Sequence, residues 1–337
     1  MSGQATRPTV AVLGTGGTIG STGRDSLDTW EYMDHAGRLS VAELLARFPE
    51  VGRAAEVEAA DAAQISSSGI TPADWLDLAA RIHALAARPA PPAGIVLTHG
   101  TATLEETAYF LNLALKTEIP VVVVGAQRPA SGFATDAGSN LAAAVRVAAA
   151  PEARGLGVLV VLNEEIHGAR EVTKASTLRL ETFRAPDLGM LGYADPDGRV
   201  ALYRRPSRRH APDTEFDLAG REGLPRVDIA YAYAGADGTA IEAFAAAGAE
   251  AIVAATLAPG LPTPAQVEAL DRARARGVVT VYSSRAGSGR VLARQTMREA
   301  GIVAADNLNP QKARVLAMLA LTVSRDPAEL QRIFDTY

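Results

Sequence analysis

A glycine-rich loop with hydroxyl side chains follows the first apolar stretch of the chain. The run 9–12 is apolar and β-branched, and it leads into the sequence LGTGGTIG at 13–20. A strand that breaks into glycines ends in a loop where backbone comes close to another group. In an open α/β sheet, ligands bind at the carboxyl ends of the strands. Because Thr15, Thr18 and Ser21 lie in or just past this loop, Thr18 is a candidate nucleophile.

A glycine loop after a first strand is also typical of nucleotide-binding sites. The dinucleotide fingerprint G-x-G-x-x-G fails here because Ile19 stands where the third glycine is needed, and no Walker Lys-Ser/Thr follows. A turn with a purely structural role remains an alternative for this stretch taken alone.

A second stretch repeats the same pattern near residue 100. The apolar run 94–97 leads into THGT at 98–101, and Thr103 with Glu106 has the spacing of a capping box. The two residues before Thr103 are therefore expected just ahead of a helix N-terminus. Backbone N–H groups and the positive end of the helix dipole favour an anion or a developing oxyanion there.

Together these stretches resemble the signatures of the bacterial L-asparaginase/glutaminase family, T-G-G-T-I near the N-terminus and H-G-T-D-T-x-E-E-T near residue 100. The resemblance covers nearly the whole chain in the right order, through VGAQRP (124–129), VTK (172–174), SSR (283–285) and LNPQKAR (308–314). The chain is identified as a divergent member of that family, because Ala102 replaces the Asp of the second motif.

The order of elements predicts an α/β protein with two domains. Strands separated by helices imply right-handed crossovers and a parallel sheet covered on both faces. We expect a larger N-terminal parallel-sheet domain, asparaginase-like and catalytic, at 1–205 and a smaller asparaginase-like α/β domain at 226–337. The stretch 206–225, rich in Arg, Pro, Asp and Gly, is the expected linker. Predicted strands and helices of the smaller domain lie at 227–231, 240–247, 251–255, 264–276 and 278–282.

The composition argues against several classes of protein. Among 337 residues the net charge is −5 and the basic residues are scattered, so we expect no nucleic-acid partner. There are no cysteines and no His/Asp/Glu cluster with metal spacing, so we expect no metal and no cofactor. No apolar run approaches the ~18 residues that span a membrane, and residues 1–8 lack a long apolar region. We therefore expect a cytoplasmic protein without membrane contact.

The resemblance implies roles for four side chains. Thr18 matches the family nucleophile, Thr101 the second site threonine, and Lys174 their basic partner. A buried lysine beside a hydroxyl can lose its charge and act as a base, whereas the alternative is a surface Lys174 paired with Glu171. Tyr32 matches the family tyrosine that is bonded to the nucleophile, although it falls about one residue late. His99 has no Asp or Ser partner at a motif spacing, so we expect a hydrogen-bonded core histidine.

The substrate-binding residues match the family only in part. Ser67 matches the serine that binds the substrate carboxylate, and Gly17 and Gly100 belong to the two signature loops. Four departures concern the substrate α-amino group or the tuning of the nucleophile: Ala102 for Asp, Ser68-Gly69 for Gln-Asp, Gly235 for Asn, and AGSGR (286–290) for an acidic segment that in the family reaches a neighbouring subunit.

These departures favour a substrate other than asparagine. An ammonium needs acceptors and negative charge nearby, and leaving it buried without them costs roughly several kcal/mol. We therefore expect hydrolysis of a C–N amide bond in an amide, imide or lactam that lacks a free α-amino group, with Arg24 or Arg290 as candidates for binding a carboxylate. The alternatives are a true L-asparaginase/glutaminase with compensated recognition and a catalytically inactive binding or regulatory homologue. The family resemblance also implies a homotetramer or dimer.

Overall fold

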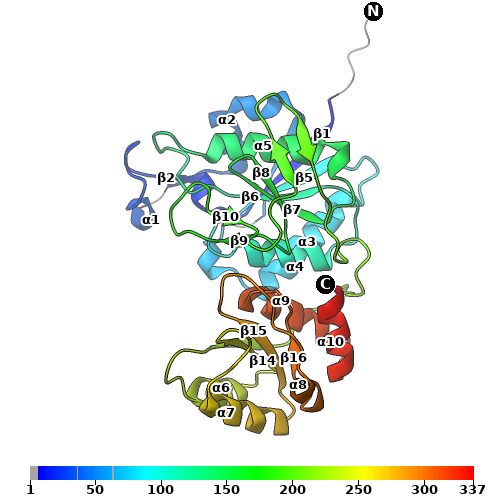
Figure 1. Cartoon of the computed structure of the whole chain (residues 1–337). Coiled ribbons are helices and arrows are strands. Elements are labelled where there is room, and N and C mark those ends of the chain that lie inside the picture. Colours follow the sequence, from blue (N-terminus) through cyan, green and yellow to red (C-terminus); the bar gives the residue numbers. More distant parts are fainter. Residues whose placement is uncertain (1–6, 36, 63) are drawn as a thin grey trace, which may run out of the picture. The chain divides into compact units, whose positions relative to one another are not determined.

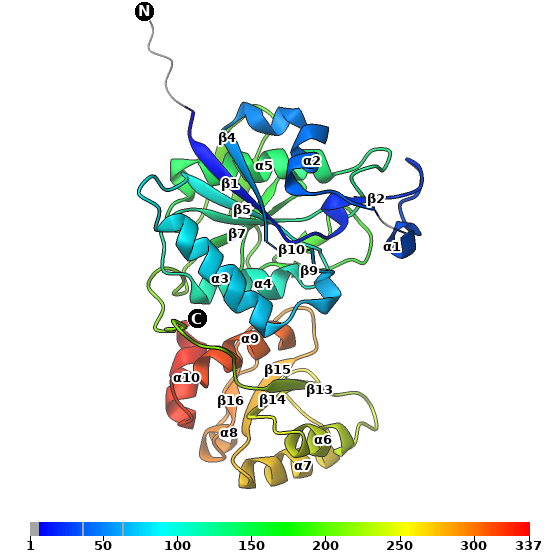
Figure 2. The same cartoon turned by 180° about the vertical axis from the view of Figure 1, so that it is seen from behind.

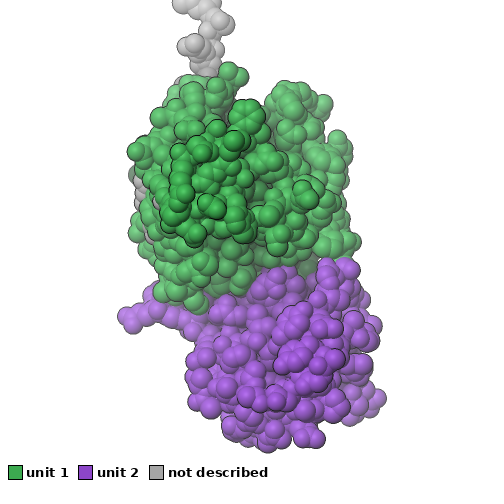
Figure 3. Space-filling model, turned by 90° about the vertical axis from the view of Figure 1, so that its left-hand side faces the viewer, with its two compact units in different colours: residues 1–214 green, residues 215–337 purple. Residues whose placement is uncertain are grey.

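The computed structural model describes residues 7–35, 37–62 and 64–337. The chain divides into two compact units, 1–214 and 215–337, which Figure 3 colours separately. This division falls inside the expected linker at 206–225. Residues 1–6, which were part of the stretch considered for a leader, lie outside the described residues.

Unit 1 is built on a mixed sheet with strand order β12-β11-β8-β7-β6-β5-β1-β4. One side of the sheet is parallel, which confirms the predicted α/β class. The other side continues antiparallel through three strands that the sequence did not predict. The parallel strands are β1 (Thr9–Gly14), β4 (Glu56–Asp61), β5 (Gly94–Thr98), β6 (Val121–Val124) and β7 (Val158–Leu162). The antiparallel strands are β8 (Glu165–Gly168), β11 (Gly192–Ala194) and β12 (Val200–Leu202).

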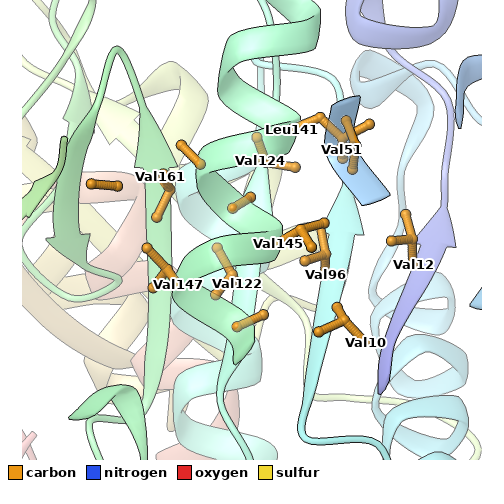
Figure 4. Packing of buried hydrophobic residues seen from close by; sticks show 14 of the residues in the cluster. Val10, Val12, Val51, Val96, Val122, Val124, Leu141, Val145, Val147 and Val161 are labelled. Carbon is orange, nitrogen blue, oxygen red and sulfur yellow. The ribbon is translucent and has the colours of Figure 1, made fainter. Parts of the chain in front are cut away.

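Helices cover both faces of this sheet. Figures 1 and 2 show α2 (Val41–Arg47) and α5 (Ala137–Ala149) on one face, and α3 (Pro72–Ala86) and α4 (Leu104–Ala114) on the other. Both α2 and α3 begin with capping boxes, formed by Ser40 with Glu43 and by Thr71 with Asp74. Valines of β1, β5 and β6 pack against α5 in a continuous core (Figure 4). Burying one such side chain is worth about 1.5–3 kcal/mol, so the core fixes where the strand ends lie.

Unit 2 has a parallel sheet of its own, as predicted, with strand order β13-β14-β15-β16. Helices α6 and α7 pack on one face and α9 crosses the other, while α10 lies against β16. The strands are β13 (Val227–Tyr231), β14 (Ala251–Thr256), β15 (Val279–Ser284) and β16 (Val303–Ala304). The helices are α6 (Thr239–Ala246), α7 (Pro264–Ala275), α8 (Gln295–Glu299), α9 (Pro310–Ala320) and α10 (Pro327–Thr336).

Short elements of unit 1 surround the carboxyl ends of its parallel strands. A small hairpin joins the strands β2 and β3, and a second one joins β9 and β10. These elements are β2 (Ser21–Thr22), β3 (Gly37–Arg38), α1 (Tyr32–His35), β9 (Thr173–Lys174) and β10 (Phe183–Arg184), with 3₁₀ turns at Thr18–Gly20 and Ser67–Gly69. Two further 3₁₀ turns, at Pro49–Arg53 and Pro151–Ala153, precede β4 and β7 in the chain.

Candidate active site

The two signature loops meet because β1 and β5 are neighbours in the sheet. Gly14 lies opposite Thr98, so both loops leave the same edge. Gly17 has φ +88°, and a Cβ placed on it would lie 2.4 Å from the backbone of Gly100. Only glycine allows this approach, and it brings Thr18 and Thr101 to one cavity.

Thr18 is paired with Tyr32 across the first loop. The Thr18 Oγ1 lies 2.8 Å from the Tyr32 hydroxyl. Burial raises the pKa of Tyr32 and outweighs the hydrogen bond with Thr18, which lowers that pKa; the charges of Asp136 and Asp28 raise it further. Tyr32 is therefore a neutral phenol that orients the Thr18 hydroxyl, and the proton of Thr18 needs another acceptor.

Lys174 is paired with Thr101 of the second loop. Its Nζ donates to the Thr101 Oγ1 at 2.7 Å. The alternative pairing of Lys174 with Glu171 is wrong, because the Glu171 carboxylate lies 3.6 Å from Nη2 of Arg204. Burial lowers the pKa of Lys174, so a larger fraction of the side chain is a neutral amine at a given pH. Lys174 is thus placed to accept a proton through Thr101.

A buried hydrogen-bond chain lies beneath the second loop, and it confirms His99 as a core histidine. The Trp75 Nε1 donates to the Thr107 Oγ1 at 2.8 Å, and this oxygen lies 2.9 Å from the His99 Nε2. The Thr107 proton is then directed to Nε2, so the His99 Nδ1–H donates to the Gly100 carbonyl at 2.8 Å. Because C=O and N–H of a trans peptide point in opposite directions, the Thr101 N–H points away from the histidine. We expect this N–H to serve as an oxyanion donor.

The buried His99 makes stability depend on pH. Burial lowers the pKa of His99 from 6.5 to about 4, so the unfolded chain binds the proton more readily between these values. The free energy of unfolding should therefore fall by up to about 3 kcal/mol as the pH drops from about 6.5 to about 4. Denaturant titrations across this pH range should show that the free energy of unfolding depends less steeply on pH in His99→Gln. Replacing the exposed His35 by Gln should keep the wild-type slope, and equal slopes in all three proteins would contradict the assignment.

The predicted capping box at Thr103 and Glu106 is wrong. Thr103 is the N-cap residue of α4, but its side chain makes no capping bond. Its Oγ1 instead donates to the Ser67 carbonyl at 2.7 Å, which ties the Ser67–Gly69 turn to the second loop. Within that turn, the hydroxyls of Ser66 and Ser68 lie 2.9 Å apart. The side chain of Thr103 therefore shapes the site rather than the helix end.

These loops enclose a cavity of about 700 Å³ at the carboxyl ends of β1 and β5. Every residue of the predicted site lines it, including Ser67, Ser68 and Ala102. Ala102 is exposed and lines this space, so a methyl group stands where the family motif has a carboxylate.

Arg38 and Gln127 also line the cavity, and the sequence did not single them out as site residues. Arg38 lies opposite Ser21 in the β2–β3 hairpin, and its Nη1 donates to the Gln64 carbonyl at 3.0 Å. The Gln127 Nε2 is buried and has no hydrogen-bond partner among the described residues. The Q-R-P motif carried a signal for Gln127, whereas nothing near Arg38 did.

The two arginines that the sequence offered for a substrate carboxylate have other neighbours. Arg24 does not line the cavity, and its Nη1 lies 4.0 Å from Glu31. Arg290 is hydrogen-bonded to Asp306 within unit 2.

The lining is cationic. It contains Lys174 and Arg38 but no Asp or Glu among the residues that the structure describes. Within the same described ranges, no cluster of His, Asp or Glu could hold a metal ion. None of the described helices is long and apolar enough to cross a membrane. Two threonine hydroxyls share this cavity, and one is hydrogen-bonded to the Tyr32 phenol and the other to the Lys174 amine. This arrangement is typical of a hydrolase that uses a hydroxyl group as its nucleophile.

Comparisons with known proteins agree with this class. The family described as "Asparaginase, N-terminal" matches residues 9–208, and the "Glutaminase/Asparaginase C-terminal domain" matches residues 226–334. L-asparaginase 2 of Bacillus subtilis is 41% identical over 330 residues, covering 98% of this chain and 87% of that protein. Glutaminase-asparaginase of Pseudomonas fluorescens is 41% identical over 331 residues, covering 97% and 90%. The crystal structure of a probable cytoplasmic L-asparaginase from Campylobacter jejuni superposes with a TM-score of 0.93 at 38% identity, covering 99% and 100%.

The chain belongs to the asparaginase family of amidohydrolases, which act on C–N bonds.

Proposed function

We propose that this protein hydrolyses the amide bond of a substrate that carries a carboxylate but no free α-amino group. The observation that supports this most strongly is the cavity itself, which holds both hydroxyl pairs and has no acidic side chain among its described lining residues. A substrate ammonium would meet no carboxylate among these residues and would face Arg38, whereas a carboxylate would be attracted.

The proposed reaction uses Thr18 as the nucleophile. Its Oγ1 attacks the amide carbonyl, and its proton passes through Thr101 and Lys174 to the leaving nitrogen. The C–N bond breaks and an acyl ester forms on Thr18. Water then attacks this ester, which releases the carboxylic acid and restores the Thr18 hydroxyl. Tyr32 orients the nucleophile, and the N–H of Thr101, in the loop just before α4, stabilises the oxyanion.

The other lining residues have proposed binding roles. Ser67, Ser68 and the backbones of Gly17 and Gly100 shape the wall around the substrate carboxylate, and Ala102 leaves that wall without a negative charge. The buried Nε2 of Gln127 supplies a further donor.

The relatives support a second candidate function. Both curated relatives described above carry L-asparaginase or glutaminase-asparaginase in their names. In that case other groups would hold the substrate ammonium in place of the motif Asp.

One ratio separates the two functions. Succinamic acid is L-asparagine without its α-amino group, and we expect its kcat/KM to exceed that of L-asparagine by at least about 10-fold, measured by release of ammonia. The Ala102→Asp variant should shift this ratio toward L-asparagine, and Ala102→Ser is the matched control. Turnover of L-asparagine or L-glutamine above that of succinamic acid would establish the second function. No turnover across amides, imides and lactams would indicate the inactive homologue.

The molecular context follows as part of the same proposal. We expect a small-molecule substrate, a homotetramer or dimer, and a cytoplasmic location, the last being supported by the name of the Campylobacter jejuni neighbour. Light scattering checks the oligomeric state, and cell fractionation checks the location. A monomer or a periplasmic protein would contradict these expectations.

A further inference from the structure

Three large apolar side chains that are mostly exposed line the candidate cavity. Trp30 and Met33 come from the segment between β2 and β3, and Leu178 comes from the loop between β9 and β10. Their exposed fractions are 60%, 57% and 58%, so each leaves most of its surface open. Exposed apolar surface that clusters around a concave site marks a place where another apolar group binds.

Other exposed apolar residues of unit 1 do not line the cavity. Leu27 and Phe133 are 80% and 73% exposed, and neither lines the cavity. The apolar character of Trp30, Met33 and Leu178 is therefore tied to the cavity, and the two outside residues provide matched controls.

Structured elements hold these three side chains. Trp30 and Met33 flank Tyr32, whose hydroxyl is bonded to Thr18 at 2.8 Å. The loop that carries Leu178 is closed by Thr182, whose carbonyl accepts from the Ala175 N–H at 2.7 Å. The apolar residues are thus positioned relative to the two hydroxyls that the proposed reaction uses.

The volume of the cavity exceeds the needs of a small acid amide. About 700 Å³ is in the range of sites for drug-sized ligands, roughly 300–1,000 Å³. A four-carbon acid amide needs less than this volume. Trp30, Met33 and Leu178 line the same cavity as Thr18, Thr101 and Lys174.

We propose that Trp30, Met33 and Leu178 form an apolar subsite that binds a hydrophobic, preferably aromatic, group of the amide substrate. This rests on the proposed function. The group belongs either to the leaving amine or to the acyl part, and both sources share the same apolar contact. With N-benzylsuccinamic acid, attack by Thr18 and hydrolysis of the ester consume one water and give succinic acid and benzylamine.

The test compares three substrates: succinamic acid, N-benzylsuccinamic acid and 2-benzylsuccinamic acid. We expect kcat/KM for one benzylated substrate to exceed that of succinamic acid by about 10-fold or more, since apolar contacts discriminate on this scale. Which of the two benefits identifies the source of the apolar group. Trp30→Ser and Leu178→Ser should each remove most of this preference and leave succinamic acid within about twofold. Leu27→Ser and Phe133→Ser should keep the preference unchanged.

Three results would overturn the subsite. The first is the absence of any benzyl preference in the wild type. The second is an equal loss of activity on all three substrates in Trp30→Ser and Leu178→Ser. The third is a preference that survives both substitutions while the mass of the assembly falls, because the apolar residues would then bind a second copy of the chain.

A binding measurement separates this inference from the proposed function. Calorimetry with benzylsuccinic acid and succinic acid needs no turnover. Benzylsuccinic acid should bind about 10-fold more tightly than succinic acid, and Trp30→Ser should remove this difference. If this result is obtained while no amide is hydrolysed, the apolar subsite is supported and the proposed function is contradicted. Equal affinities of the two diacids would overturn the subsite itself.

Discussion

Replacing Thr18 with alanine is expected to lower kcat/KM for the preferred acid amide by at least about 10³-fold, because the nucleophile is lost. The cavity walls should remain, since Gly17 and Gly100 rather than the Thr18 side chain bring the two loops together. Binding of the product acid should therefore change little. Steady-state kinetics and calorimetry on the same protein measure both effects.

Two further variants control for folding and for the hydroxyl itself. In the wild type the Thr18 hydroxyl lies 2.8 Å from the Tyr32 hydroxyl. Thr18→Ser keeps a hydroxyl at this position, so it should retain more activity than Thr18→Ala. Thr22→Ala makes the same change at a threonine that does not line the cavity, and it should keep wild-type activity. Undiminished turnover in Thr18→Ala would show that Thr18 is not the nucleophile.

Replacing Lys174 with methionine is expected to lower kcat by about 10²–10⁴-fold, which is the usual contribution of a general base. Methionine keeps much of the length of the side chain but removes the amine that lies 2.7 Å from Thr101. Lys116→Met is a matched control, because Lys116 donates to Thr214 outside the cavity. It should change stability more than activity, and a similar loss of activity in both variants would contradict the role of Lys174.

The same lysine determines the acid limb of the pH profile. Burial lowers the pKa of Lys174, and only the neutral amine accepts a proton, so activity should rise with pH through an apparent pKa below 10.5. In Ala102→Asp a carboxylate would stabilise the ammonium, and the limb should move to higher pH. An unchanged limb in that variant would show that another group controls the profile.

The buried parallel strands were predictable because apolar runs ended in glycine, as at Gly14 and Gly100. β4 was not, because Glu56–Asp61 lies at the edge of the sheet and carries charged side chains. The antiparallel strands beyond β7 are only three or four residues long, too short for a periodic pattern to emerge. The Thr103 capping box failed because a tertiary partner, the Ser67 carbonyl, competes for the hydroxyl.

The candidate site could be predicted where a motif fixed the position of a residue in its loop. Thr18, Thr101 and Lys174 were of this kind, and the cavity contains all three. Arg38 and Leu178 could not be found in this way, because their places depend on how the β2–β3 and β9–β10 hairpins fold over the sheet edge. An isolated arginine or leucine in a loop carries no local signal of a cavity.

We expect Thr18 to carry out covalent amide hydrolysis in a cavity whose residues Ser68 and Ala102 do not fit an α-ammonium group. Rapid quenching of the enzyme with its best acid amide, followed by peptide mapping in a mass spectrometer, tests this most directly. We expect an acyl adduct on the peptide that contains Thr18, formed from succinamic-acid-type substrates and absent in Thr18→Ala. An adduct on Thr101, or turnover in which L-asparagine gives the larger adduct on Thr18, would contradict it.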